Sequence, residues 1–316
     1  MRDTFLSTLL EIARRDPRVL LLTGDVGFGV MEPFVAELPR QFINVGVAEQ
    51  NLTGVATGLA MSGHVVFTYS IANFPTLRCL EQIRNDACYH RAPVKIVAIG
   101  GGFSYGALGY SHHATEDIAI MRALPEMTVL CPSDILEAEG ATRAAYATPG
   151  TCYLRLDKSH APALASADAK FLFGKVRRLR PGTQVVILGA GGILGEALHA
   201  AEVLGREGID CGVFSVHTVK PLDDAWIIDM CRAASLVVTL EEHTLDGGLG
   251  SAIAEVVTDA GVFPRAFRRF GLRSSSCANV GRQSYLRKRH QLDADALVAG
   301  IRQALGGDRT SALSPE

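Results

Sequence analysis

Residues 42–70, FINVGVAEQNLTGVATGLAMSGHVVFTYS, decide the fold class because their periodicity changes twice. The apolar runs 42–47 and 64–70 are typical of buried strands, and the segment 49–63 between them has helical spacing. Strands that alternate with helices indicate a mostly parallel sheet covered by helices on both faces. The stretch therefore predicts an α/β fold.

The same alternation extends along the chain in two blocks, so we expect two doubly wound domains. The first is predicted over residues 1–160 and the second over 176–305, with a linker at 161–175. The segment DCGVFSVHTVKP, residues 210–221, is assigned to the second block. Residues 306–316 have too little apolar content to pack and are expected to form a disordered tail.

Composition narrows the class of protein. The chain has 316 residues, 48% hydrophobic, with a formal charge of −2, so nothing electrostatic favours nucleic acid or an anionic membrane. Its seven scattered cysteines form no Cys-x-x-Cys pair, which fits a reducing compartment. There is neither a signal-peptide core nor a run of roughly 18 apolar residues. We expect a soluble, cytoplasmic protein.

Four loops are candidates for the functional site. Open parallel sheets bind ligands beyond the carboxyl ends of their strands. The loops expected at that edge are TGDVGFG (23–29), GVAEQ (46–50), TYSIANF (68–74) and GGGFSYGALGYSHH (100–113).

Glu49 is a lone carboxylate in the second of these loops. An acid in the first turn of a helix is favourable beside the helix dipole, so a purely structural role is one interpretation. The other rests on its surroundings, which are apolar and contain no Lys or Arg within a helical turn. A carboxyl group without a charged partner can stay protonated and donate a hydrogen bond to a heterocycle nitrogen. Spacing alone leaves both interpretations open.

Two other motifs carry weaker signals. GAGGILG, residues 189–195, departs from the G-x-G-x-x-G spacing of dinucleotide-binding loops, and Asp210 precedes a strand instead of ending one. His112 and His113 are adjacent and cannot readily share a metal ion, so no metal site is predicted. One imidazole could contact a polar substrate, and a surface pair without function fits the sequence equally well.

Four blocks of the sequence together resemble transketolase. They are GVAEQNLTGVATGLA, CLEQIRNDA, HHATEDIAIMRALPEMTVLCPSD, and VKPLDD followed by VVTLEEHTLDGGLGSAIAE. Their order and spacing are similar to the pyrimidine-binding and C-terminal domains of that family, over roughly residues 1–305. The resemblance implies the C-terminal subunit of a split transketolase, a transferase of two-carbon units.

The resemblance also implies roles for individual residues. Glu49 would hydrogen-bond the aminopyrimidine ring of thiamin diphosphate and help to activate the cofactor, with Gln50 and Asp25 nearby. An aromatic side chain should stack on that ring, for which Phe74 is the first candidate and Tyr69 the reserve. His112 would act in catalysis and contact the substrate, together with His113.

A partner chain is implied as well. The family binds the diphosphate and Mg²⁺ through a Gly-Asp-Gly motif and a later Asn, and Gly-Asp-Gly does not occur in this sequence. We therefore expect Mg²⁺ to be bound by the partner, with no metal ligand in this chain. The cofactor would lie between the two polypeptides of an α2β2 assembly.

Departures from the family pattern concern the substrate. Leu108 stands where sugar-phosphate transketolases have an acceptor-recognising Asp, and Gly100 and Gly29 replace a phosphate-binding His and Ser. Lys158 replaces a phosphate-binding Arg and loses its bidentate geometry. These changes predict an acceptor other than an ordinary pentose phosphate.

Two alternatives stay open at this point. The β subunit of a 2-oxo acid dehydrogenase of the pyruvate dehydrogenase type has the same two domains and cofactor. A non-catalytic scaffold subunit would have the fold without the chemistry.

Overall fold

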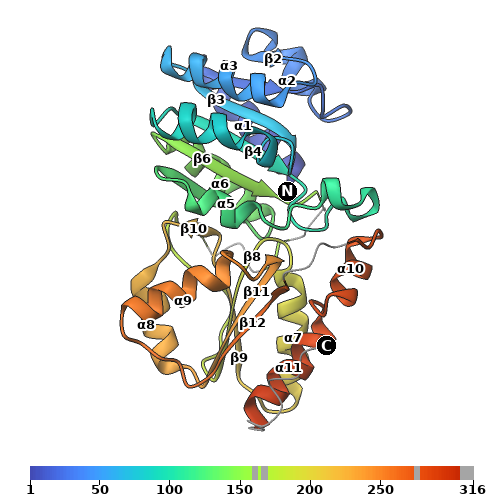
Figure 1. Ribbon diagram of the computed structural model, residues 1–316, viewed down its shortest axis with the longest axis vertical. Coiled ribbons are helices and arrows are strands. Elements are labelled where there is room, and N and C mark those ends of the chain that lie inside the picture. Colours follow the sequence, from blue (N-terminus) through green and yellow to red (C-terminus); the bar gives the residue numbers. More distant parts are fainter. Residues whose placement is uncertain (159–162, 165–169, 274–277, 307–316) are drawn as a thin grey trace.

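The computed structural model describes residues 1–158, 163–164, 170–273 and 278–306 and contains two α/β units (Figure 1). The predicted fold class, two α/β domains, is confirmed. The predicted boundaries stay predictions, since most of the linker's first half and residues 307–316 lie outside the described residues. Among the helices described, none combines the length and apolar composition needed to cross a membrane.

The first sheet has seven strands in the order β10-β5-β6-β4-β3-β1-β2, and all but β10 run parallel. The six parallel strands are β1 (Val19–Thr23), β2 (Phe42–Asn44), β3 (Val65–Ile71), β4 (Val94–Ile99), β5 (Met127–Leu130) and β6 (Thr151–Leu156). Because they are parallel, their carboxyl ends meet at one edge of the sheet.

Helices cover both faces of this sheet. They are α1 (Arg2–Arg15), α2 (Glu32–Glu37), α3 (Glu49–Met61), α4 (Leu80–Gln82), which continues into a π-helical turn (Ile83–Cys88), α5 (Asp117–Ala123) and α6 (Ile135–Ala147). Residues of α1 and α6 share one apolar cluster, while α3 and α5 belong to another. Side chains of a strand alternate between faces, so Phe67 and Tyr69 of β3 face α1, and Val66 faces α3.

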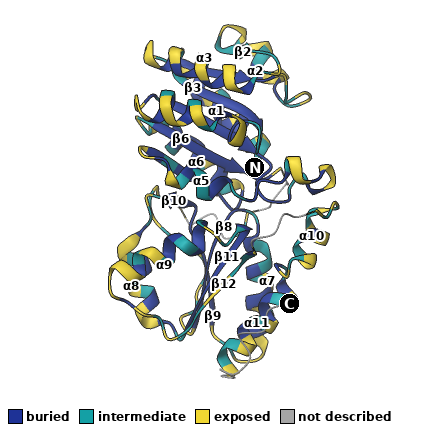
Figure 2. Ribbon diagram, viewed as in Figure 1, coloured by how far each residue is buried: buried dark blue, intermediate teal, exposed yellow. Residues whose placement is uncertain are grey.

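The second sheet has the order β12-β11-β8-β9-β7, with β7 antiparallel at one edge. Its strands are β7 (Arg177–Arg180), β8 (Val185–Ala190), β9 (Cys211–Ser215), β11 (Leu236–Thr244) and β12 (Phe267–Leu272). Its helices are α7 (Leu194–Arg206), α8 (Asp224–Ala233), α9 (Leu249–Asp259), α10 (Gln283–Arg289) and α11 (Ala294–Gly306). Figure 2 shows that the central strands β8, β9 and β11 are buried, whereas the outer faces of the helices beside them are exposed.

Within the segment 210–221, β9 lies in the second sheet as expected, whereas β10 (Thr218–Lys220) joins the first sheet. It pairs antiparallel with β5 of the first sheet, and the backbone N–H of Cys131 donates to the carbonyl of His217 at 2.7 Å. The Lys220 ammonium donates to the carbonyl oxygens of Arg122 (2.9 Å) and Leu124 (2.6 Å). A strand edge needs partners for its backbone groups, and here the second unit supplies them.

Arg155, on β6, connects the two units through buried polar contacts. Its Nε donates to Asp117 Oδ2 at 2.8 Å, and its Nη2 donates to the carbonyls of Ala114 (2.9 Å) and Glu242 (3.1 Å). Glu242 belongs to β11 of the second sheet. The Arg155 and Asp117 side chains are only 2% and 0% exposed, so their charges depend on each other for compensation.

Arg155→Met should destabilise the protein by about 3–5 kcal/mol, because Asp117 would remain buried without its cation. Chemical denaturation measures this loss as a change in the free energy of unfolding. Arg143 is the matched control, since it is 44% exposed and pairs with Glu11 and Glu139 at the surface. Arg143→Met should cost no more than about 1 kcal/mol. Equal losses in the two variants would contradict the role assigned to Arg155.

Candidate functional site

Five of the predicted site residues follow the carboxyl ends of parallel strands. Asp25 follows β1, Glu49 follows β2, Phe74 follows β3, His112 lies in the loop after β4, and Lys158 follows β6. The loops selected from the sequence therefore lie at one edge of the first sheet. That edge is the place where open parallel sheets bind ligands.

Glu49 begins α3 and is buried, with 3% of its surface exposed. The N-terminus of a helix favours a carboxylate there. The loop after β1 closes in from one side, because a Cβ placed on Gly24 would lie 3.6 Å from Glu49 Cγ. From another direction, Arg78 Nη1 donates to Glu49 Oε2 at 2.6 Å.

The Arg78 contact corrects an expectation from the sequence. Glu49 was expected to have no basic partner, because no Lys or Arg lies within a helical turn of it. Arg78 lies 29 residues further along, in the 3₁₀ turn Leu77–Cys79 that precedes α4. This turn packs beside α3, so the pair forms only in the tertiary structure. The one signal in the sequence was that Arg78 closely follows the loop 68–74, which was already expected at the same edge.

Phe74 lies with Glu49 and Arg78, whereas Tyr69 does not. The guanidinium carbon of Arg78 is 4.6 Å from the centroid of the half-buried Phe74 ring. Tyr69 is buried and stacks against Phe5 of α1, with ring centroids 6.3 Å apart. The alternation of β3 side chains sends Tyr69 to the face opposite α3. Of the two aromatic candidates, only Phe74 is therefore connected with the acid, through the Arg78 guanidinium.

The two adjacent histidines have different surroundings. The His112 ring lies edge-on to Phe74 at 5.2 Å, and its Nδ1 is 3.0 Å from the Ser111 hydroxyl. Burial, and next the neighbouring His113, lower the pKa of His112 below its ordinary value. His113 is fully buried, with Nε2 3.3 Å from the carbonyl of Gly106. Of the two imidazoles expected to contact a substrate, only His112 reaches the site.

Tyr105 was not singled out in the sequence, yet it connects His112 with Lys158. Its ring centroid is 6.3 Å from that of His112, and the Lys158 ammonium lies 4.7 Å from the Tyr105 centroid. A Cβ on Gly100 would lie 2.2 Å from Tyr105 Cδ2, so this ring occupies the space that a side chain at position 100 would need. Leu108, in the same loop, is 56% exposed.

Asp25 and Gln50 lie at the outer part of the site. Asp25 has a φ of 60° and is exposed. Its Oδ1 accepts from Asn44 Nδ2 at 2.9 Å, and its backbone N–H donates to Asn44 Oδ1 at 3.0 Å. These bonds hold the loop after β1 against the end of β2. Gln50 is exposed on the first turn of α3.

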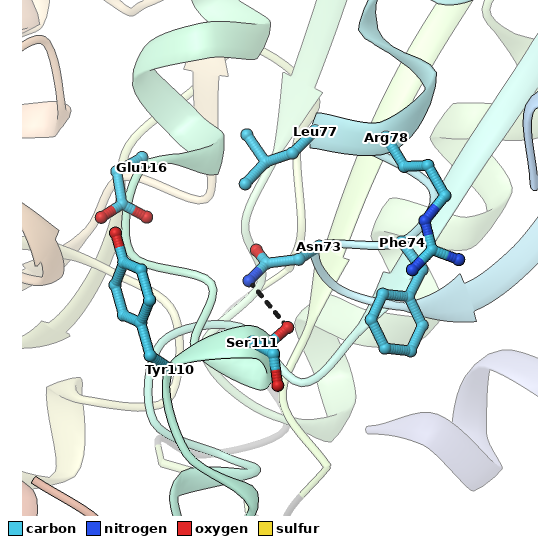
Figure 3. Close-up of a pocket in the computed structure, with 7 residues that line it drawn as sticks. All are labelled: Asn73, Phe74, Leu77, Arg78, Tyr110, Ser111 and Glu116. Carbon is cyan, nitrogen blue, oxygen red and sulfur yellow. Dashed lines mark hydrogen bonds between the residues drawn. The ribbon is translucent and has the colours of Figure 1, made fainter. Parts of the chain in front are cut away.

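An open pocket of about 280 Å³ lies between the turn after β3 and the loop after β4 (Figure 3). Its lining residues are Asn73, Phe74, Leu77, Arg78, Tyr110, Ser111 and Glu116. Asn73 Nδ2 donates across it to the carbonyl of Ser111 at 3.3 Å. Within the described ranges, no three His, Cys, Asp or Glu side chains are grouped so that they could hold a metal ion. Glu49 itself does not line this pocket, and Arg78 connects the pocket with the buried acid.

Two family models match the chain. The transketolase pyrimidine binding domain matches residues 1–163, and the transketolase C-terminal domain matches residues 174–296.

Curated relatives have related descriptions. The chain is 37% identical to the 6-deoxy-6-sulfo-D-fructose transketolase subunit SqwH of Clostridium sp. (strain MSTE9), over 94% of this chain and 92% of the relative. It is 34% identical to one of the subunits of the apulose-4-phosphate transketolase of Actinobacillus succinogenes, over 84% of this chain and 85% of the relative.

A solved structure has a similar fold over almost the full length. It is described as a split gene transketolase, inactive beta4 tetramer, with a TM-score of 0.85 and 34% sequence identity over 98% of both chains. These findings agree on one family: both of its domain models match in order, the relatives are more than 30% identical, and the fold matches. The chain belongs to the transketolase family.

Proposed function

We propose that this chain is one subunit of a two-component, thiamin diphosphate-dependent transketolase that transfers a two-carbon ketol unit from a ketose to an acceptor. The observation that carries the proposal is the buried Glu49 carboxyl at the start of α3, beside Phe74, at the ligand-binding edge of the first sheet. Membership in the family implies thiamin diphosphate. When bound, that cofactor supplies a carbanion-stabilising centre for carbon–carbon bond cleavage and formation.

The residues of this chain would hold and tune the pyrimidine half of the cofactor. Glu49 would share a proton with a ring nitrogen, because a buried carboxyl group can hold that proton in a fixed direction. Phe74 would stack on the ring and fix its plane. His112, edge-on to Phe74 and with its pKa lowered by burial, would contact the polar substrate beside the ring.

The proposal includes a second chain that binds the diphosphate and Mg²⁺, since the sequence contains no Gly-Asp-Gly. Large apolar side chains remain exposed in the site loops, among them Phe28 (79%), Val47 (75%) and Tyr110 (52%). Exposed apolar side chains in the loops at one edge of the sheet suit a protein interface. The split gene transketolase described as an inactive beta4 tetramer supports the idea that such a chain needs a second component. An α2β2 assembly would then place each site between unlike chains.

The acceptor is proposed to differ from an ordinary pentose phosphate. Tyr105 occupies the space beside Gly100, the position of a phosphate-binding His in the family, and Lys158 packs over the Tyr105 ring. The exposed Leu108 offers no charged or polar group to the acceptor. The relatives named for apulose 4-phosphate and 6-deoxy-6-sulfo-D-fructose support an unusual sugar as a substrate class.

Glu49→Gln should lower the turnover of the reconstituted subunit pair, with thiamin diphosphate and Mg²⁺, by roughly several hundredfold or more, as expected for loss of an essential activating group. The amide keeps the shape but cannot exchange a proton with the ring. Steady-state kinetics measure the change. Glu81→Gln in α4, an exposed acid nearby, is the control and should leave turnover unaltered. If both variants retain full activity, the chain is a scaffold and not a catalytic subunit.

A screen of donor and acceptor pairs should favour a pair other than xylulose 5-phosphate with ribose 5-phosphate. Removing a bidentate Arg and two polar groups from one subsite weakens its hold on a phosphate. The specificity constants kcat/KM of the reconstituted pair decide the question, and equal efficiency with the pentose phosphates would refute the proposed acceptor class. Transfer of an acyl group to a lipoyl arm in the same assay would instead identify a 2-oxo acid dehydrogenase.

A further inference from the structure

Arg78 makes two contacts that resemble those expected of the proposed cofactor. Its Nη1 donates to Glu49 Oε2 at 2.6 Å, and its guanidinium carbon lies 4.6 Å from the centroid of Phe74. Figure 3 shows the guanidinium beside the Phe74 ring at one end of the pocket. One flat, donor-rich group thus engages both the buried acid and the aromatic ring.

These are the two contacts that the aminopyrimidine needs under the proposed function. A guanidinium is planar and stacks on aromatic rings, as an aminopyrimidine does. The guanidinium donates to the Glu49 carboxylate, whereas the ring nitrogen of an aminopyrimidine would accept the proton of that carboxyl group. Both groups would use the Glu49 carboxyl and the Phe74 ring. On another side of Glu49 lies Gly24, where an added Cβ would be in ordinary van der Waals contact with Glu49 Cγ at 3.6 Å. The two groups therefore compete for one place.

The burial of the pair identifies Arg78 as its outer member. The Glu49 side chain is 3% exposed, whereas that of Arg78 is 47% exposed. Arg78 lines the pocket, and Glu49 is not among the seven lining residues, so the guanidinium faces both the pocket and the carboxyl. A long side chain with an exposed end can change rotamer without disturbing the core.

We infer that Arg78 is an autoinhibitory cap on the cofactor site, which must leave Glu49 and Phe74 before the aminopyrimidine of thiamin diphosphate can bind. The inference rests on the proposed function. The apparent affinity for the cofactor is then the intrinsic affinity multiplied by the fraction of molecules in which the cap is open. The cap is held by one ion pair, in which the Arg78 side chain is 47% exposed, and by one cation–π contact, and the arriving cofactor would replace both contacts.

Arg78→Met tests the cap directly. In the reconstituted subunit pair, the variant should bind thiamin diphosphate with Mg²⁺ about 5- to 30-fold more tightly, the range expected from one ion pair with an exposed arginine end and one cation–π contact. Isothermal titration calorimetry measures the Kd without relying on turnover. Arg78→Gln, which keeps a polar end, should also tighten binding. Arg84→Met is the control, since Arg84 is an exposed arginine in the π-helical turn that follows α4.

A double variant, Glu49→Gln with Arg78→Met, tests whether Arg78 affects cofactor binding through its contact with Glu49. The ion pair is already broken in the Glu49→Gln variant, so adding Arg78→Met should change the Kd much less than it does in the native chain. Weaker binding by Arg78→Met would mean that Arg78 holds the cofactor, and an unaltered Kd would mean that it does not compete. Either result overturns the cap and leaves the proposed function standing. If neither the native pair nor any variant binds thiamin diphosphate, both proposals fall.

Discussion

Arg155 lies where the two sheets and the loop after β4 meet. Because its charge is buried there, the surrounding segments must place hydrogen-bond acceptors around it. Its guanidinium needs acceptors, which come from Asp117 of α5, the carbonyl of Ala114 and the carbonyl of Glu242 in β11. A Cβ on Gly101 would lie 2.8 Å from Arg155 Cζ, so only glycine lets the loop pass this closely. Both ends of the loop that carries His112 are held in this way.

Glu242 of the second sheet also holds the loop after β4 in place. The carboxylate of Glu242 accepts from the backbone N–H of Phe103 and from the side chains of Gln283 and Arg287. The C-terminal unit therefore has a direct part in shaping the site, although its own strands carry none of the candidate site residues. With β10 completing the first sheet, the two units form a continuous framework behind the site loops.

Side chains that alternate along β3 point to opposite faces of the sheet, and only one of these faces supports the helix that carries Glu49. Phe67 and Tyr69 fill the core against α1, while the opposite face supports α3, whose first residue is Glu49. The chain after β3 then turns back toward α3 and brings Phe74 and Arg78 beside the acid. A site assembled in this way offers one half of a binding surface, which agrees with the exposed apolar residues of its loops and with the proposed second chain.

The sequence by itself determined the α/β fold, the edge of the sheet at which the site lies and the position of Glu49 at a strand-to-helix junction. These follow from periodicity and from Gly-rich turns, which depend on neighbours a few residues apart. Only the tertiary structure decided that Arg78 pairs with Glu49, that Tyr105 fills the space beside Gly100, that His113 is buried and that β10 joins the first sheet. Each of these depends on groups far apart in the chain, and no local pattern specifies which of them will meet once the loops have folded against one another.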